Sequence, residues 1–361
     1  MSSTTSLTEK KAFQLPRLAR EDTVLIYSIS IALAVWACIA LLFATAFPDT
    51  STDLVNNASA FSGYVTRNAT FFLFGFVILS AFRFLQDSRG KDSATYIREA
   101  YSRNPARFLG IPVMLGLSLV SFAVFMLVYS TIKTRIPEIL PFAWDQTFAA
   151  WDKAVFFGHD PWRLFEWVYD VPVIVRTVDF IYDFWALFLV GSWVVCFISR
   201  EQSLQRRLQY CLALILTWFI GGNLLALLFS SAGPCYYHEV YAGSTYYADQ
   251  MAHLNAIGDL RALDHQAMLW SAYSSSSLGL GGISAMPSMH CATAFLFILM
   301  FGQSGMWRIL TVTLFVIIFL GSFILAWHYA LDGVLAMLVA YACWRLAGYI
   351  ARYILRDPAK A

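Results

Sequence analysis

Long apolar blocks, separated by polar loops, dominate this chain of 361 residues. About eight of them approach the ~20 residues that a helix needs to cross ~30 Å of hydrocarbon. These blocks are 23–47, 69–85, 108–130, 173–198, 208–230, 288–303, 309–327 and 332–351. Because a helix satisfies its own backbone hydrogen bonds in lipid, the pattern predicts an all-α, polytopic membrane helix bundle.

The composition agrees with a membrane protein. Hydrophobic residues make up 59% of the chain and charged residues only 13%, whereas about a quarter of a soluble domain is charged. The 6 cysteines show no metal-ligand spacing, so we expect neither a disulfide framework nor a bound metal. We expect no cofactor and no nucleic acid partner, and the sequence leaves the oligomeric state open.

The distribution of lysine and arginine predicts the orientation of the chain. With the amino terminus inside, most of the 25 basic residues fall in inner loops and tails, as the positive-inside rule requires. Both termini are then cytoplasmic, and all 6 histidines lie on the outer side. The membrane could be a bacterial plasma membrane or a Golgi-like membrane. A compact chain without long tails favours the bacterial plasma membrane, whose outer side faces the periplasm.

Two long outer segments, 131–172 and 231–287, are rich in tryptophan, tyrosine and charge. Amphipathic aromatic sequences of this kind lie at the membrane interface. We therefore expect partly helical caps over the outer end of the bundle.

Polar residues with catalytic potential stand where two of the late spans begin. Ser288 and His290 lie in "AMPSMHCATAF", residues 285–295, and His328 and Asp332 lie in "LAWHYALDG". Two helical legs of about 19 residues separate the histidines, and each leg rises ~28 Å, close to one hydrocarbon thickness. Both imidazoles should therefore return to the same depth on the outer face.

These residue types suit phosphoryl transfer through a phosphohistidine. Asp332, at i,i+4 from His328, can fix the tautomer of that ring and leave its other nitrogen free to attack. A protonated His290 can donate to the departing oxygen, and Ser288 at a helix start can hold an anionic group. The ordinary alternatives are a helix N-cap for Ser288 and a structural, interfacial role for either histidine.

At these residues the sequence resembles the type 2 phosphatidic acid phosphatase superfamily. The P-S-x-H motif of that superfamily is matched by Pro287, Ser288 and His290. Its H-x3-D motif is matched by His328 and Asp332. The resemblance implies that His328 is the nucleophile, that Asp332 orients it and that His290 is the acid. It also implies a fold with a six-helix core and no requirement for metal.

The same resemblance divides the chain into three parts. Residues 105–356 would form the catalytic six-helix core. Residues 23–104 would add two accessory transmembrane helices and a cytoplasmic loop, and residues 1–22 would be a cytoplasmic tail.

Two departures from the superfamily pattern point to one branch of it. The lysine and Arg-Pro of its first motif are absent, and "SSAGPCYY", residues 230–237, stands in their place. Ser322 stands where its third motif has an arginine. In both respects the chain resembles the branch of fungal inositol phosphorylceramide synthase and its bacterial inositolphosphotransferase-like relatives.

The missing basic residues raise the question of what binds the phosphate, since its transition state needs compensating charge. Basic candidates on the outer side are Arg176, which is the most suggestive, and Lys133, Arg135 and Arg261. Further candidate substrate contacts are Gly233, Pro234, Tyr236 and Tyr237. The ordinary alternatives are snorkelling of Arg176 to lipid headgroups and plain turn chemistry at the Gly-Pro pair.

The loss of basic residues favours a diester substrate, because a monoanionic diester needs less compensating charge than a dianionic monoester. We therefore expect an integral membrane phosphotransferase that moves a phospho-headgroup from a phospholipid donor to a lipid hydroxyl. A phosphatase acting on phosphatidate or an isoprenyl pyrophosphate is one alternative. A transporter with a histidine-lined vestibule is another, although it would need polar residues at mid-membrane.

Overall fold

The computed structural model describes residues 20–46, 105–199, 201–274, 282–303 and 305–356, with positions 95, 99 and 102. Every regular element in these ranges is a helix. In chain order they are α1 (Arg20–Ala46), α4 (Pro105–Lys133), α5 (Ile136–Ile139), α6 (Asp145–Val155), η2 (Pro161–Asp170), α7 (Pro172–Asp183), α8 (Trp185–Ile198), α9 (Leu204–Phe219), η3 (Ile220–Leu225), α10 (Ala226–Leu228), η4 (Pro234–Tyr236), α11 (Tyr237–Val240), α12 (Ala248–Ile257), α13 (Arg261–Ser274), α14 (Met289–Phe301), α15 (Gly305–Ile324) and α16 (Ala330–Ile354).

Within the described ranges, 6 helical stretches are long and apolar enough to cross a membrane. They are Arg20–Ala46, Gly110–Ile139, Pro172–Ile198, Leu204–Leu228, Gly305–Ile324 and Ala330–Ile354, and α14 is a shorter apolar helix. The predicted all-α, multi-pass membrane fold is therefore confirmed. The predicted span 69–85 lies outside the described residues, as do residues 1–19 of the predicted tail.

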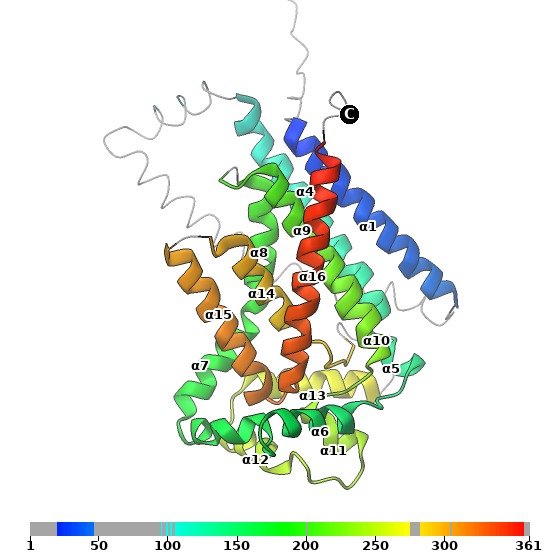
Figure 1. The fold of residues 1–361 in the computed structure, drawn as a ribbon, viewed down its shortest axis with the longest axis vertical. Coiled ribbons are helices and arrows are strands. Elements are labelled where there is room, and N and C mark those ends of the chain that lie inside the picture. The colour runs from blue at the N-terminus through cyan, green and yellow to red at the C-terminus, as the bar shows by residue number, and fades with distance from the viewer. Residues whose placement is uncertain are drawn as a thin grey trace, which may run out of the picture.

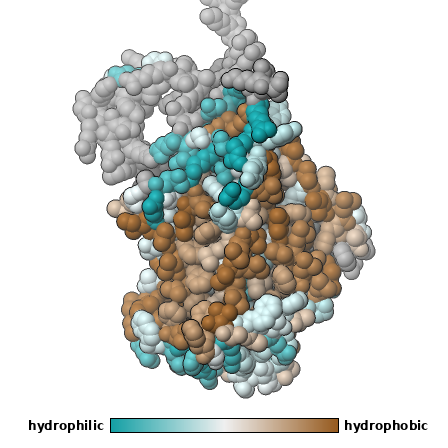
Figure 2. Space-filling model, viewed as in Figure 1, coloured by the Kyte–Doolittle hydropathy of each residue, from teal (hydrophilic) through white to brown (hydrophobic). Residues whose placement is uncertain are grey.

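The centre of the bundle is α9, against which α1, α14 and α16 all pack (Figure 1). Apolar side chains surround this helix, so it is buried on nearly every side, as expected for a core helix. Its fully buried residues include Leu208, Cys211 and Leu214. The outer helices expose apolar side chains instead, and Figure 2 shows the resulting hydrophobic belt with hydrophilic surface at both ends.

The two segments expected to form caps are partly helical and gather at one end of the bundle (Figure 1). The first contributes α5, α6 and η2, and the second contributes η4, α11, α12 and α13. α6 packs against α16, and η2 packs against α12 and α15. These contacts place the cap directly over the start of α16.

A break in one membrane-spanning stretch shapes the wall beside the start of α14. α7 ends at Asp183 and α8 begins at Trp185, on either side of Phe184. α15 approaches α7 closely at Gly321, where an added Cβ would lie 2.8 Å from Val178 Cγ1 and 3.1 Å from Tyr182 Cδ2. This close approach fixes Tyr182 at the inner side of the break.

Asn223 links three parts of the bundle within the apolar interior. The residue lies in η3, a π-helical turn, and is 1% exposed. Its Oδ1 accepts a hydrogen bond from Trp36 Nε1 at 3.2 Å, and its Nδ2 donates to the Tyr129 carbonyl at 3.2 Å. Hydrogen bonds between membrane helices contribute ~1 kcal/mol each, so Asn223 helps to hold α1 and α4 against the α9–η3 helix.

Replacing Asn223 should therefore weaken the attachment of α1. In Asn223→Ala the Trp36 N–H and the Tyr129 carbonyl lose their partner, which we expect to cost ~1–3 kcal/mol. Thermal unfolding in detergent measures the loss. The neighbouring Leu224 is 44% exposed, so Leu224→Ala is the control, and an equal effect of the two substitutions would contradict the role of the Asn223 hydrogen bonds.

Candidate active site

Two helix starts bring the candidate histidines together at the capped end of the bundle. Ser288 is the N-cap of α14, and its side chain accepts a hydrogen bond from Cys291 N at 3.4 Å. His290 therefore lies in the first turn of α14, whereas His328 lies just before Tyr329, the N-cap of α16. The centroids of the two imidazole rings are 6.3 Å apart. A tetrahedral phosphoryl group between two rings at this separation lies within reach of both.

Two acceptors determine the tautomer of His328. Its Nδ1 lies 2.8 Å from the Ala285 carbonyl oxygen and 3.2 Å from Asp332 Oδ2. A carbonyl oxygen can only accept a hydrogen bond, so we assign the proton to Nδ1. Nε2 then carries the free lone pair, which is the form that a nucleophilic imidazole requires.

Burial keeps the His328 ring neutral. The residue is 7% exposed, and this desolvation lowers its pKa to about 3, against a smaller upward effect of the Ala285 carbonyl. The nearby Lys133 charge lowers the pKa further. Since the ordinary pKa of histidine is ~6.5, His328 is unprotonated and able to attack throughout the neutral pH range.

The 230–237 segment supports the loops that carry the site. Ser231 accepts hydrogen bonds from Ala285 N at 2.9 Å and, through Oγ, from Met286 N at 3.3 Å. Cys235 N donates to the Ala326 carbonyl at 2.9 Å. The segment is therefore hydrogen-bonded both to the loop that contains Ala285 and to the loop that precedes His328.

Two aspartates of α6 hold the same loops from the cap. Asp145 accepts from Ala232 N, Gly233 N and Tyr329 OH, at 2.9, 2.8 and 2.8 Å. Asp152 lies about two turns further along the same face of α6. It accepts hydrogen bonds from Ala330 N at 2.7 Å and Leu331 N at 3.0 Å. Asp152 therefore caps the start of α16 from another helix. Burial raises the pKa of Asp152 to about 7, although the two backbone N–H groups favour its charged form.

The sequence interpretation missed both aspartates. Their signal is visible, because Asp145, Phe148, Ala149 and Asp152 follow the spacing of one helix face and all are buried. Charged residues on the apolar face of an amphipathic helix need partners. Here the partners are backbone groups of distant loops, which the local sequence does not reveal.

His290 packs against two aromatic rings beside the α7–α8 break. Its ring stacks on Tyr182 at 4.5 Å and 21°, and it lies 4.2 Å from Trp185 at 42°. Trp185 in turn stacks on Trp218 at 6.0 Å. Trp218 is fixed by a hydrogen bond from its Nε1 to Thr293 Oγ1 at 3.1 Å. These contacts hold the His290 ring in place facing His328.

Among the basic candidates, Lys133 is the one whose charge acts on both imidazole rings. It is 9% exposed, and its Nζ donates to the Ser284 carbonyl at 3.3 Å. The other candidates make contacts elsewhere: Arg176 donates to the Ile257 carbonyl at 2.9 Å, Arg261 pairs with Asp183 at 2.8 Å, and Arg135 pairs with Glu138. Arg176 is exposed, at the edge of the cap.

A family model described as the PAP2 superfamily matches residues 146–346. The match covers more than half of the chain and includes both histidines and Asp332. The chain belongs to the PAP2 superfamily. No curated protein and no solved structure matches the chain. Together with the apolar helices, this membership indicates a membrane phosphatase or phosphotransferase.

The remaining candidate residues of this PAP2 protein lie in the 230–237 segment, which supports the loops of the site. The Gly233 N–H is used by Asp145, and Pro234 is buried at the start of η4. Tyr236 OH donates to the Gln266 carbonyl at 3.0 Å, and Tyr237 stacks on Tyr246 at 5.3 Å. Within the described ranges, no group of three or more His, Cys, Asp or Glu side chains has the arrangement of a metal site.

Gly233 has a steric role that can be tested with a matched pair of glycines. Gly233 and Gly243 have φ values of 99° and 84°, so alanine at either position costs ~1–2 kcal/mol of backbone strain. At Gly233 a Cβ would also lie 2.6 Å from the Trp327 carbonyl oxygen, whereas at Gly243 it meets nothing within 4 Å. We expect Gly233→Ala to reduce turnover of a lipid phosphate at least ~10-fold by displacing the His328 loop. Gly243→Ala should stay within about 2-fold of wild type, and equal losses would contradict this role.

Proposed function

We propose that this PAP2 protein moves a phospho-headgroup from a phospholipid donor to a lipid hydroxyl through a phosphohistidine at His328. The observation that carries the proposal is the arrangement of His328. Its Nδ1–H is held by Ala285 and Asp332, and its ring lies 6.3 Å from that of His290. His328, with its tautomer fixed, therefore faces His290 across a gap that can hold a phosphoryl group. We assign the role of nucleophile to His328 and the role of acid to His290.

In the first step, His328 Nε2 attacks phosphorus and the bond from phosphorus to the lipid oxygen breaks. His290 donates its proton to that leaving oxygen, as a general acid. The anionic phosphoryl group between the rings favours the protonated form of His290 before the step begins. The imidazole of His328 becomes positively charged, and the carboxylate of Asp332 stabilises that charge.

In the second step, an acceptor hydroxyl attacks the phosphohistidine and the phosphorus–nitrogen bond breaks. His290 now accepts the hydroxyl proton, which restores the starting state of both rings. His328 and Asp332 are 7% and 0% exposed, so the site is shielded from bulk water. This burial favours transfer to a lipid hydroxyl over hydrolysis.

The charge of the site favours a diester donor. We assign to Lys133 the role of balancing the phosphoryl oxygens, since its charge acts on both imidazoles. One lysine suits a monoanionic diester better than a dianionic monoester. The Gly-Pro/Tyr segment at 230–237 resembles the inositol phosphorylceramide synthase branch, so we propose an inositol phosphate headgroup and a ceramide-like acceptor as the first substrates to test.

We further propose that the capped end of the bundle faces the exterior. The basis is the excess of lysine and arginine in the segments assigned to the other side. The donor lipid would then enter from the outer leaflet, both termini would be cytoplasmic, and a bacterial plasma membrane would place the site in the periplasm.

A covalent intermediate should form on His328 and nowhere else. Purified protein given a donor lipid with a labelled headgroup phosphate, quenched in alkali and digested, should carry the label on the peptide that contains His328. His328→Asn should reduce turnover by at least ~10⁴-fold and remove the label, because the nucleophile is lost.

The products distinguish the possible reactions. Label on an added acceptor lipid supports the transferase. Label released as a water-soluble phosphate would instead establish the phosphatase. Label bound to the His328→Asn variant at wild-type level would contradict the phosphohistidine.

The role of Lys133 can be separated from a general effect of positive charge. Lys133→Met should lower kcat ~10²-fold, because it removes the compensating charge from the transition state. Arg176→Met is the matched control, since Arg176 bonds to the Ile257 carbonyl at the exposed cap edge, and we expect it to stay within about 3-fold. A larger loss in Arg176→Met than in Lys133→Met would assign phosphate binding to Arg176.

A further inference from the structure

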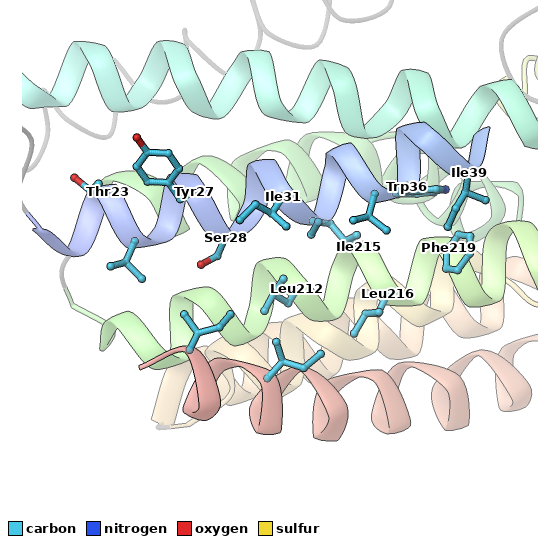
Figure 3. A pocket seen from close by; sticks show the side chains of 15 residues that line it. Thr23, Tyr27, Ser28, Ile31, Trp36, Ile39, Leu212, Ile215, Leu216 and Phe219 are labelled. Carbon is cyan, nitrogen blue, oxygen red and sulfur yellow. The ribbon is translucent and has the colours of Figure 1, made fainter. Parts of the chain in front are cut away.

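An apolar groove runs along the membrane-facing side of the bundle, and its lining includes neither histidine. α1 and α16 both pack against α9, and the groove lies between them with α9 as its floor (Figure 3). Its volume is about 700 Å³. The lining residues are Thr23, Val24, Tyr27, Ser28, Ile31, Ala32, Val35, Trp36 and Ile39 of α1, Leu212, Ile215, Leu216 and Phe219 of α9, and Ile350 and Ile354 of α16.

One end of the groove lies opposite the active site. α16 carries Asp332 at its start and the groove residues Ile350 and Ile354 at its end. Asp332 and Ile350 are separated by roughly 27 Å of helix. A polar group bound at this end therefore lies on the membrane face away from the catalytic histidines, and the rest of the groove extends from there toward the middle of the bundle.

The polar and apolar residues of the lining are separated along the groove, as the two parts of an amphiphilic ligand would require. Hydroxyl groups occur at one end only, on Thr23, Tyr27 and Ser28, and the rest of the lining is apolar. Within a membrane, hydrocarbon fills an apolar groove of this kind. The polarity pattern therefore fits an alkyl chain with a polar group at the Thr23 end.

The groove is long enough for one acyl chain. The stretch of α1 that lines it, from Thr23 to Ile39, is roughly 24 Å long. An extended alkyl chain can therefore lie along α1 within the groove volume of about 700 Å³.

The polar end of the groove carries a net positive charge. Arg20 precedes Thr23 and Val24 by three and four positions, so it shares the groove face of α1, and it is exposed. Arg356 lies two residues after Ile354, just beyond α16, and is also exposed. The exposed Glu21 precedes Val24 by three positions and offsets only part of this charge. Asp22 points inward, is 6% exposed and lies 3.8 Å from Arg207. The charge presented by Arg20 and Arg356 suits a lipid phosphate.

We propose that the groove is a binding site for an anionic phospholipid. One acyl chain lies between α1 and α16, and the headgroup phosphate lies between Arg20 and Arg356. The bound lipid bridges two helices that both pack against α9, and it stabilises the attachment of α1 to the bundle. The site is independent of the proposed reaction and needs no turnover.

Headgroup and chain can be tested separately on the detergent-purified protein. Phosphatidylglycerol should raise the melting temperature by about 4 °C or more, whereas phosphatidylcholine with the same chains should raise it by less than about 1 °C. Soluble glycerol phosphate should have no effect, because it lacks the chain. Native mass spectrometry should show one retained phosphatidylglycerol per chain. Equal shifts with both lipids, or a shift with glycerol phosphate alone, would overturn the proposal.

Two pairs of variants locate the site. Ala32→Trp fills the groove and should abolish the shift with phosphatidylglycerol, whereas Ala34→Trp, on an exposed part of α1 outside the groove, should retain it. Arg20→Gln with Arg356→Gln should reduce lipid retention at least ~10-fold, whereas Arg345→Gln, two turns before the groove end of α16, should not. The retention measurement stands even if Ala32→Trp fails to fold.

The competing occupants of the groove would be other protein segments. A disulfide between Ile31→Cys and a cysteine placed within 69–85 would put that part of the chain in the groove. A disulfide between the Ile31→Cys residues of two copies would put a second copy there. Either result in lipid vesicles, at high yield, would overturn the proposal.

Discussion

The geometry of this protein depends on one buried imidazole whose Nδ1–H is shared between the Ala285 carbonyl and Asp332. A neutral ring without these acceptors would exchange tautomers freely, and its reactive nitrogen would not be defined. Both acceptors must therefore be held within a few tenths of an ångström. That requirement explains why so much of the cap consists of backbone hydrogen bonds around three short lengths of loop, at 231–235, 285–288 and 326–329.

Carboxylates on α6 meet part of this requirement in a way that a membrane protein can tolerate. Asp145 and Asp152 are 0% and 1% exposed, and burying a lone carboxylate is costly. Each one accepts at least two hydrogen bonds, mostly from backbone N–H groups at loop ends and at the start of α16. A carboxylate that binds two successive N–H groups fixes the orientation of both peptides. The cap thereby acts as the support of the site as well as its cover.

The apolar spans and the two helix starts that carry the histidine motifs could be predicted from the sequence, because both depend on local information. A run of apolar residues has to cross the bilayer as a helix, and equal lengths of helix return His290 and His328 to one level. The roles of Arg176 and Gly233 could not be inferred this way. Arg176 lies at the correct end of its helix, but its side chain bonds to Ile257. Gly233 is in a suggestive loop, but its N–H bonds to Asp145, 88 positions away. Partners at such separations are set by tertiary packing, which also brings Lys133 to the histidines.

Charge limits what such a site can bind. A neutral His328, the Asp332 carboxylate and Lys133 leave the resting centre near electrical neutrality, and Asp332 is directed at the back of the nucleophile rather than at the phosphate. In the proposed reaction, a monoanionic phosphodiester adds one negative charge to this neutral centre, and a proton on His290 can balance it before it passes to the leaving oxygen. A dianionic monoester would add a second negative charge in a medium of low dielectric constant, where an unbalanced charge is costly. Under the proposed mechanism, the same buried surroundings that keep His328 neutral would therefore favour the less charged ester.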